Sequence, residues 1–186
     1  MSTPDEPTNG FPMAVLIEGG LVIVALGVGW LFGVPIREQL PADGGELAGA
    51  IGRGAAAALP MLAVFWWLVH SRRPALRQMR EQVEELVGEL FTSGNWAQFA
   101  LVAVLAGVGE ELLFRGVLQT LVVGWTTPVI GIVICSLLFG LAHALSRVYF
   151  VLATLIGLFL GTLAWTYQDL LAPMTAHAVY DFVALV

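Results

Sequence analysis

The chain has 186 residues, of which 58% are hydrophobic and 12% are charged, and its formal net charge is −6. A soluble domain is about half apolar and about a quarter charged, so this composition excludes an ordinary soluble domain and indicates a membrane protein. All eight basic residues are arginines, and the negative net charge argues against nucleic acid as a partner.

The first residues, 1–12, are polar, acidic and rich in proline, which predicts a disordered tail. This tail lacks the basic region of a secretory signal, so we expect the first apolar segment to be kept as a membrane anchor. About 20 apolar residues are needed for a helix to span the bilayer. We expect six such helices, at about 13–34, 51–70, 97–121, 127–146, 149–167 and 170–186.

The predicted fold is an all-α membrane protein with about six transmembrane helices and one amphipathic helix on the cytoplasmic side. Apolar residues recur at helical spacing in 74–91, which predicts the amphipathic helix there; an ordinary charged connector helix is the alternative. We expect one integrated membrane domain, in which 13–94 holds the N-terminal transmembrane helices and the connector, and 95–186 holds the remaining helices.

Arginines predict the orientation in the membrane. Arg72, Arg73, Arg77 and Arg80 follow the second apolar segment, and Arg147 lies between the fourth and the fifth. Loops rich in Arg and Lys face the cytoplasm. We therefore expect these arginines and both termini on the cytoplasmic side of a bacterial plasma membrane, with membrane lipid as one partner.

Ionisable side chains lie inside the predicted transmembrane segments, where each costs a few kcal/mol. The C-terminal half holds most of them: Glu110, Glu111, Arg115, His143, His177 and Asp181. A group that faces one interior cavity is the simplest explanation. In the first segment Glu18 has no evident partner, and we expect it near an interface or facing a polar interior.

The spacing of these residues suggests pairs. Glu111 and Arg115 are four residues apart and lie on one helix face, so they can form an ion pair. Glu110 points about 100° away from Glu111 and must face something else. His177 and Asp181 are also four apart, so Asp181 can orient His177. Three glycines flank the acidic pair and would let neighbouring helices come close: Gly107, Gly109 and Gly116.

These residues have other interpretations. A Glu–Arg pair can be purely structural, and an intramembrane histidine often only hydrogen-bonds a neighbouring helix. Glu110, His143 and His177 come from three different segments, which favours a shared site. Together with Asp181 they are also plausible Zn²⁺ ligands, although the helical HExxH motif is absent.

Three short motifs follow one another in the C-terminal half. GEELLFRG (109–116) contains EExxxR, FGLAH (139–143) contains FxxxH, and HAVYD (177–181) contains Hxxx(N/D). In order and rough spacing they resemble the motifs of the CPBP family of intramembrane proteases. That family includes CAAX prenyl endopeptidases and bacterial proteins linked to bacteriocin self-immunity. The resemblance covers about residues 95–186.

The resemblance implies an intramembrane endopeptidase that hydrolyses a peptide or membrane-protein substrate. It implies that Glu110 is the general base, that His143 positions the water, and that His177 and Asp181 stabilise the oxyanion. The residues that would shape the site are Glu111, Arg115 and Phe139. A glutamate-dependent reaction without a cofactor is favoured; if zinc is present, Glu110, His143 and His177 would hold it.

One departure from the family pattern affects the last motif. CAAX enzymes usually have Asn where this chain has Asp181. Asn can donate a hydrogen bond to an oxyanion, whereas an ionised Asp cannot. Asp181 would therefore be protonated, orient His177 or serve as a ligand.

Two other functions stay open. A proton- or ion-coupled transporter also uses buried Glu, Asp and His residues. A catalytically idle immunity or scaffold protein needs the fold but no reaction. A carboxylate removed from water becomes a better proton acceptor, which agrees with a hydrolase without proving one.

Overall fold

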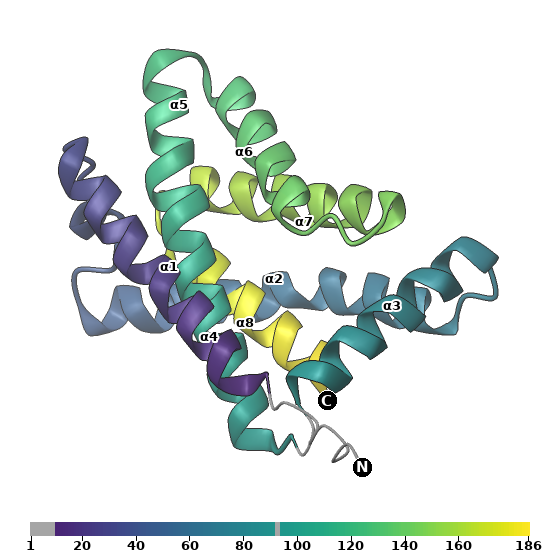
Figure 1. Ribbon diagram of the computed structural model, residues 1–186. Coiled ribbons are helices and arrows are strands. Elements are labelled where there is room, and N and C mark those ends of the chain that lie inside the picture. Colours follow the sequence, from purple (N-terminus) through teal and green to yellow (C-terminus); the bar gives the residue numbers. More distant parts are fainter. Residues whose placement is uncertain (1–9, 92–93) are drawn as a thin grey trace, which may run out of the picture.

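The computed structural model describes residues 10–91 and 94–186, and every regular element in them is a helix (Figure 1). The elements are α1 (Phe11–Leu31), the 3₁₀-helix η1 (Ile36–Gln39), α2 (Gly44–His70), α3 (Pro74–Leu90), α4 (Trp96–Glu111), the π-helix η2 (Leu112–Gln119), α5 (Thr120–Trp125), α6 (Pro128–Ala142), α7 (Arg147–Tyr167) and α8 (Leu171–Leu185). The predicted all-helical fold is confirmed.

The N-terminal tail is shorter than predicted. Of the segment 1–12, residues 1–9 lie outside the described part of the chain, whereas Phe11 and Pro12 already belong to α1. Pro12 is compatible with the first turn of a helix, because its missing N–H would have no partner there. The backbone N–H of Gly10 donates to the carbonyl oxygen of Glu89 at 3.2 Å, which ties the start of α1 to the end of α3.

Among the described residues, three helices are long and apolar enough to cross a membrane: α1, α2 and α7. The six predicted segments are all mainly helical, but the number six is not confirmed. α6 is apolar and has 15 residues, and α8 also has 15 residues. Residues 97–121 run through α4, η2 and into α5, where ionisable groups lower the hydropathy.

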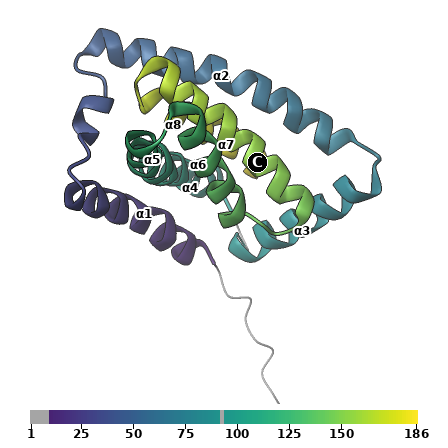
Figure 2. The same cartoon turned by 90° about the horizontal axis from the view of Figure 1, so that it is seen from above.

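The first three helices form an outer frame around the others. Seen from above, α1, α2 and α3 surround α4 to α8 (Figure 2). α8 packs against α2 and α4, α6 packs against α7, and α1 packs against α4 and η2. The C-terminal helices that carry the motifs are therefore held between elements of the N-terminal half.

Glycines make two of these contacts close, as predicted. A Cβ atom added at Gly107 would lie 2.9 Å from the Cβ atom of Ala178 in α8. One added at Gly109 would lie 2.6 Å from the carbonyl oxygen of Glu18 in α1. Real Cβ atoms do not approach other atoms so closely, so α4 meets both neighbours backbone to backbone just before its glutamates.

The predicted helix at 74–91 is present as α3, and Leu76 and Met79 are buried under it. Arg80 Nη1 donates to the carbonyl oxygens of Leu68 at 2.7 Å and Ser71 at 2.9 Å, so it pairs carbonyls at the end of α2. That α3 lies on the inner surface of the membrane stays a prediction.

The π-helix η2 was not predicted. It begins directly after Glu111 and contains Arg115. π-helical turns are rare and are frequently found at functional sites.

Candidate active site

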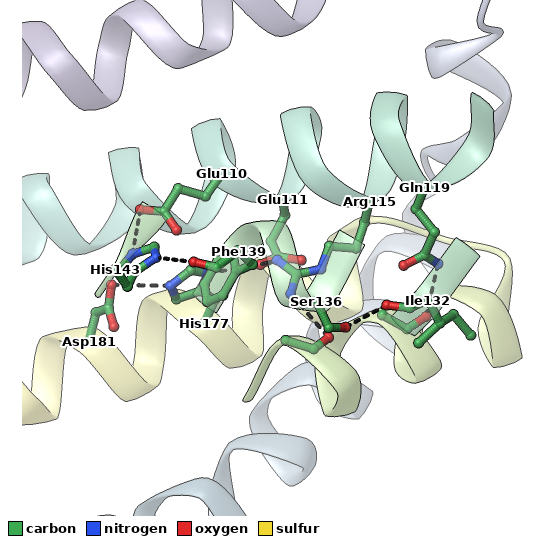
Figure 3. Close-up of polar contacts among 12 residues, drawn as sticks. Glu110, Glu111, Arg115, Gln119, Ile132, Ser136, Phe139, His143, His177 and Asp181 are labelled. Carbon is green, nitrogen blue, oxygen red and sulfur yellow. Dashed lines mark hydrogen bonds and ion pairs between the residues drawn. The ribbon is translucent and has the colours of Figure 1, made fainter. Parts of the chain in front are cut away.

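Six ionisable side chains of the C-terminal half gather between α4, η2, α8 and the turn after α6 (Figure 3). They are Glu110 and Glu111 at the end of α4, Arg115 in η2, His143 directly after α6, and His177 and Asp181 in α8. The sequence predicted that these residues would meet, and they do.

Glu111 is the centre of a fully buried cluster. Arg115 Nη1 donates to Glu111 Oε1 at 2.7 Å, and Nδ1 of His177 lies 2.8 Å from the same oxygen. Arg115 Nη2 also donates to the carbonyl oxygen of Gly157 in α7 at 3.1 Å. The predicted pairing of Arg115 with Glu111 is confirmed. Because all three side chains are buried, this cluster fixes the His177 ring and links η2, α7 and α8.

His143 lies outside the helix in which the sequence placed it. The predicted segment 127–146 continues past His143, whereas α6 ends at Ala142 and His143 is its C-cap. Nδ1 of His143 lies 2.9 Å from the carbonyl oxygen of Phe139, and since a carbonyl only accepts, Nδ1 carries the hydrogen. The ring thus donates a hydrogen bond to a carbonyl that has no partner within the helix. The prediction that His143 lies within the helix was wrong.

Glu110 faces His143 rather than Arg115. Oε1 of Glu110 lies 3.4 Å from Nε2 of His143. Its other oxygen, Oε2, is buried and has no hydrogen-bond partner among the described residues. The Glu110 side chain is 8% exposed and that of His143 is 27% exposed, so this pair is less deeply buried than the Glu111 cluster.

Each histidine contacts a carboxylate through Nε2. With its hydrogen on Nδ1, a neutral His143 turns the lone pair of Nε2 toward Glu110. An ionised carboxylate has no hydrogen to donate, so the contact is favourable only when one further proton lies on either partner. The same holds for His177, whose Nδ1 donates to Glu111 and whose Nε2 lies 3.4 Å from Oδ2 of Asp181.

Asp181 therefore takes the orienting position that its spacing predicted. Its side chain is 27% exposed, on the opposite side of the His177 ring from Glu111. With one proton in the His177–Asp181 pair, the Nε2–Oδ2 contact becomes a hydrogen bond.

Phe139 separates the two carboxylate–histidine pairs. Its ring stacks on His143 with centroids 4.4 Å apart, meets His177 edge-on at 5.9 Å, and lies 4.5 Å from the guanidinium carbon of Arg115. Phe139 thus packs against groups of both pairs, as a residue that shapes the site would.

A cavity of about 110 Å³ opens beside these pairs. Its walls are Phe139, His143, Tyr149, Ala153, Ile156, His177, Tyr180 and Asp181. The two histidines and Asp181 share this cavity as predicted, whereas Glu110 is not part of its wall and contacts His143 behind it. An almost wholly apolar groove of about 220 Å³ lies next to the cavity and shares Ile156 and Tyr180 with it.

Sequence reasoning missed several residues near the site. Tyr149 and Tyr180 line the cavity, but an aromatic residue near a helix end is ordinarily part of the aromatic belt. Arg53 donates to Asp169 at 2.8 Å and joins α2 to the turn before α8. Those two residues are far apart in the chain, and no local spacing could have paired them.

The predicted metal ligands do not form a metal site as they are placed. Among residues 10–91 and 94–186, no three His, Cys, Asp or Glu side chains are grouped so that they could hold a metal ion. Glu110, His143 and His177 instead belong to two separate pairs with Phe139 between them.

Comparison with known proteins connects this half of the chain to one family. Residues 92–183 match the family model described as type II CAAX prenyl endopeptidase Rce1-like. The uncharacterized protein YpbD of Bacillus subtilis (strain 168) is 35% identical over 99 residues, which are 51% of this chain and 48% of that protein. The chain thus spans about half the length of this curated relative. No solved structure matches the chain.

Proposed function

We propose, from the match of residues 92–183 to the type II CAAX prenyl endopeptidase Rce1-like family, that this chain hydrolyses a peptide bond within the membrane, with Glu110 as the general base. The observation that carries the proposal is that Glu110 contacts a histidine of fixed tautomer and no cation among the described residues, whereas Glu111, whose Oε2 is also buried without a partner, is paired with Arg115. A buried acceptor without a partner is costly, and a water molecule held for reaction would satisfy it.

In the proposed reaction, water lies against Oε2 of Glu110 and within reach of His143. Glu110 accepts a proton from the water while the water oxygen attacks the carbonyl carbon of the peptide bond. His143 holds Glu110 in place through the Nε2–Oε1 contact of 3.4 Å. General-base catalysis of this kind contributes typically 10²–10⁴-fold to a rate.

The oxyanion would be stabilised from the other side of the cavity. His177 and Asp181 both line the cavity, and a proton on the Asp181 carboxyl group would make it a hydrogen-bond donor there. The Glu111 cluster holds the His177 ring in one orientation through the 2.8 Å contact. A preorganised donor costs no reorganisation when negative charge develops on the carbonyl oxygen.

The substrate we propose is a peptide, or the end of a membrane protein, that carries an apolar group next to the bond that is cut. The apolar groove shares two wall residues with the cavity, so a prenyl chain or an apolar segment could lie in it while the peptide enters the cavity. Two peptides of one sequence, with and without a farnesyl group, test this point. Faster cleavage of the farnesylated peptide would support the prenyl assignment, and equal rates would contradict it.

We also propose that all six predicted segments lie within the bilayer of a bacterial plasma membrane and that both termini are cytoplasmic. The exposed Gln78 in α3 offers a labelling position, and Cys135 is buried and can be replaced by Ser. A membrane-impermeant thiol reagent should label Gln78→Cys only from the cytoplasmic side. Labelling only from outside would reverse the topology.

A coupled transporter is the second candidate, because polar groups extend beyond the cavity. Asp181, His177, Glu111 and Arg115 form a continuous chain of contacts. Arg115 also lines a polar pocket of about 330 Å³ between η1, α5 and the end of α7. Arginine keeps its protons in proteins, so a proton relay along this chain would stop at Arg115, and we favour hydrolysis.

Purified protein in detergent, and the same protein in liposomes, test the two candidates together. We expect wild type to cleave the peptide in the presence of a metal chelator and Glu110→Gln to fail. A proton or ion flux that the same substitution abolishes, without any cleavage by wild type, would instead support a transporter. If the wild type showed neither cleavage nor flux, the interpretation as a catalytically idle scaffold protein would remain.

A further inference from the structure

α1 lies outside the residues that match the family, yet it contacts the candidate active site. A Cβ atom added at Gly109 would lie 2.6 Å from the carbonyl oxygen of Glu18 and 3.2 Å from the Cβ atom of Leu21. Gly109 directly precedes Glu110. The backbone of α1 at Glu18 therefore lies against the backbone of α4 at the residue before the proposed base.

Glu18 is the only ionisable residue of α1, and its oxygen Oε2 is buried without a hydrogen-bond partner among the described residues. The charged groups that act on it are Glu110 of α4, Asp181 and His177 of α8, and His143 at the end of α6. These four belong to the two pairs of the site. An apolar side chain at position 18 would avoid the cost of burying a carboxylate, so its presence needs a reason.

Glu18 and Glu110 each have an Oε2 atom that is buried without a hydrogen-bond partner among the described residues. Both residues lie where α1 meets α4, so one donor placed between their side chains would satisfy both oxygens. Water has two O–H bonds and fits this requirement. We propose that Glu18 is a further catalytic residue, which holds the attacking water together with Glu110. This inference rests on the proposed peptide hydrolysis.

The reaction balances with one proton on Glu18 at the start. Glu110 takes a proton from the water, and the water oxygen forms a bond to the carbonyl carbon. Glu18 then gives its proton to the peptide nitrogen as the C–N bond breaks and the amine leaves. The proton on Glu110 returns to Glu18 through the next water molecule, so one water is consumed and both carboxyl groups recover their first state.

The experiment compares wild type with Glu18→Gln and Glu18→Leu by kcat, KM, the pH profile and thermal unfolding in detergent. We expect kcat to fall about 10²-fold, as for loss of a general acid, with little change in KM. The alkaline side of a bell-shaped kcat profile should disappear, because that side reports the acid. The melting temperature should stay equal or rise, since a buried unpaired carboxylate is removed. The exposed Glu85→Gln in α3 is the control for loss of one negative charge.

The outcomes separate this inference from the proposed function. An active Glu18→Gln beside an inactive Glu110→Gln would overturn the role of Glu18 and leave the proposed hydrolysis standing. A parallel loss of melting temperature and activity in both Glu18 variants would assign a structural role and also overturn it. A wild type without peptidase activity would overturn both proposals.

Discussion

Glu110 and Glu111 are neighbours in the chain, and each contacts a histidine, yet the two pairs are built differently. Glu111 is fully buried and accepts from both Arg115 and His177 at 2.7 and 2.8 Å. Among the described residues, Glu110 contacts only His143, at 3.4 Å, and both carboxylates keep a buried Oε2 without a hydrogen-bond partner. Consecutive residues of a helix point about 100° apart, so one carboxylate joins Arg115 and His177 while the other turns toward His143.

The difference indicates which pair is structural and which is reactive. A buried charge that is paired and hydrogen-bonded holds helices together, and removing one partner is strongly destabilising. Glu110 has no cation beside it and contacts only a histidine among the described residues, so its carboxylate stays available to a water molecule. The same residue type, at adjacent positions, thus has two roles that the surroundings decide.

The largest expected effect comes from Glu110→Gln. Gln keeps the shape of Glu but cannot accept a proton from water, so the cleavage rate should fall by about 10²–10⁴-fold. The protein should remain folded and inserted, because an ionisable group is removed from the membrane interior. Cleavage rate and thermal unfolding in detergent measure the two effects. An active variant would eliminate the glutamate-base mechanism, and a metal-dependent one would then survive only if a chelator inactivated wild type.

Arg115→Ala should act on stability first. It leaves the Glu111 charge buried without its cation, which typically costs about 3–5 kcal/mol, and activity should fall as the fold loosens. Chemical unfolding in detergent measures the change. Arg77→Ala is the matched control, because Arg77 also pairs with a Glu four residues on, at 2.8 Å, but on the exposed surface. If both arginine variants were equally stable, the Glu111 cluster would not be the structural pair.

His143→Ala should lower the cleavage rate about 10²-fold, with little effect on stability, if His143 and Glu110 hold one water. His70→Ala is a close control. His70 also bonds the carbonyl four residues back, at 2.8 Å, and its ring lies 4.5 Å from that of Trp66, but it is exposed at the end of α2. A variant of His143 that keeps full activity, or that loses only as much as His70→Ala, would remove His143 from the mechanism.

The smallest effect is expected for Asp181→Asn. Asn donates a hydrogen bond without a shared proton, so the rate should stay within a few-fold of wild type and depend less on pH. Asp181→Ala provides the contrast and should be slower. A pH profile of kcat for the three proteins is the measurement. If Asp181→Asn were as slow as Asp181→Ala, the site would require the negative charge of Asp181 and not a hydrogen-bond donor at this position.

Local spacing predicted the parts of the site that lie within one helix. The pairs Glu111–Arg115 and His177–Asp181 follow from positions four residues apart. The contact between Glu110 and His143 joins α4 to the turn after α6, and only the tertiary fold could supply it. The end of α6 at Ala142 also had no strong signal, because the apolar residues continue past it.

The membrane segments show a similar division. α1, α2 and α7 have the length and hydropathy of spanning helices, and the sequence identified all three. The segments that carry the site are less apolar or shorter, since they contain the ionisable groups or end early. Composition alone therefore predicted the scaffold better than the helices that surround the cavity.

The π-helical segment η2 affects how the chain tolerates changes in its length. In a π-helix each N–H reaches back five residues instead of four, so η2 holds more residues per turn than α4 before it or α5 after it. Loss of one residue beyond Arg115 would let this stretch tighten into an ordinary α-helix, while both glutamates keep their positions. The same loss in α7 would rotate every later residue by about 100°. Single-residue gaps among relatives should accordingly fall in 116–119 and spare α7.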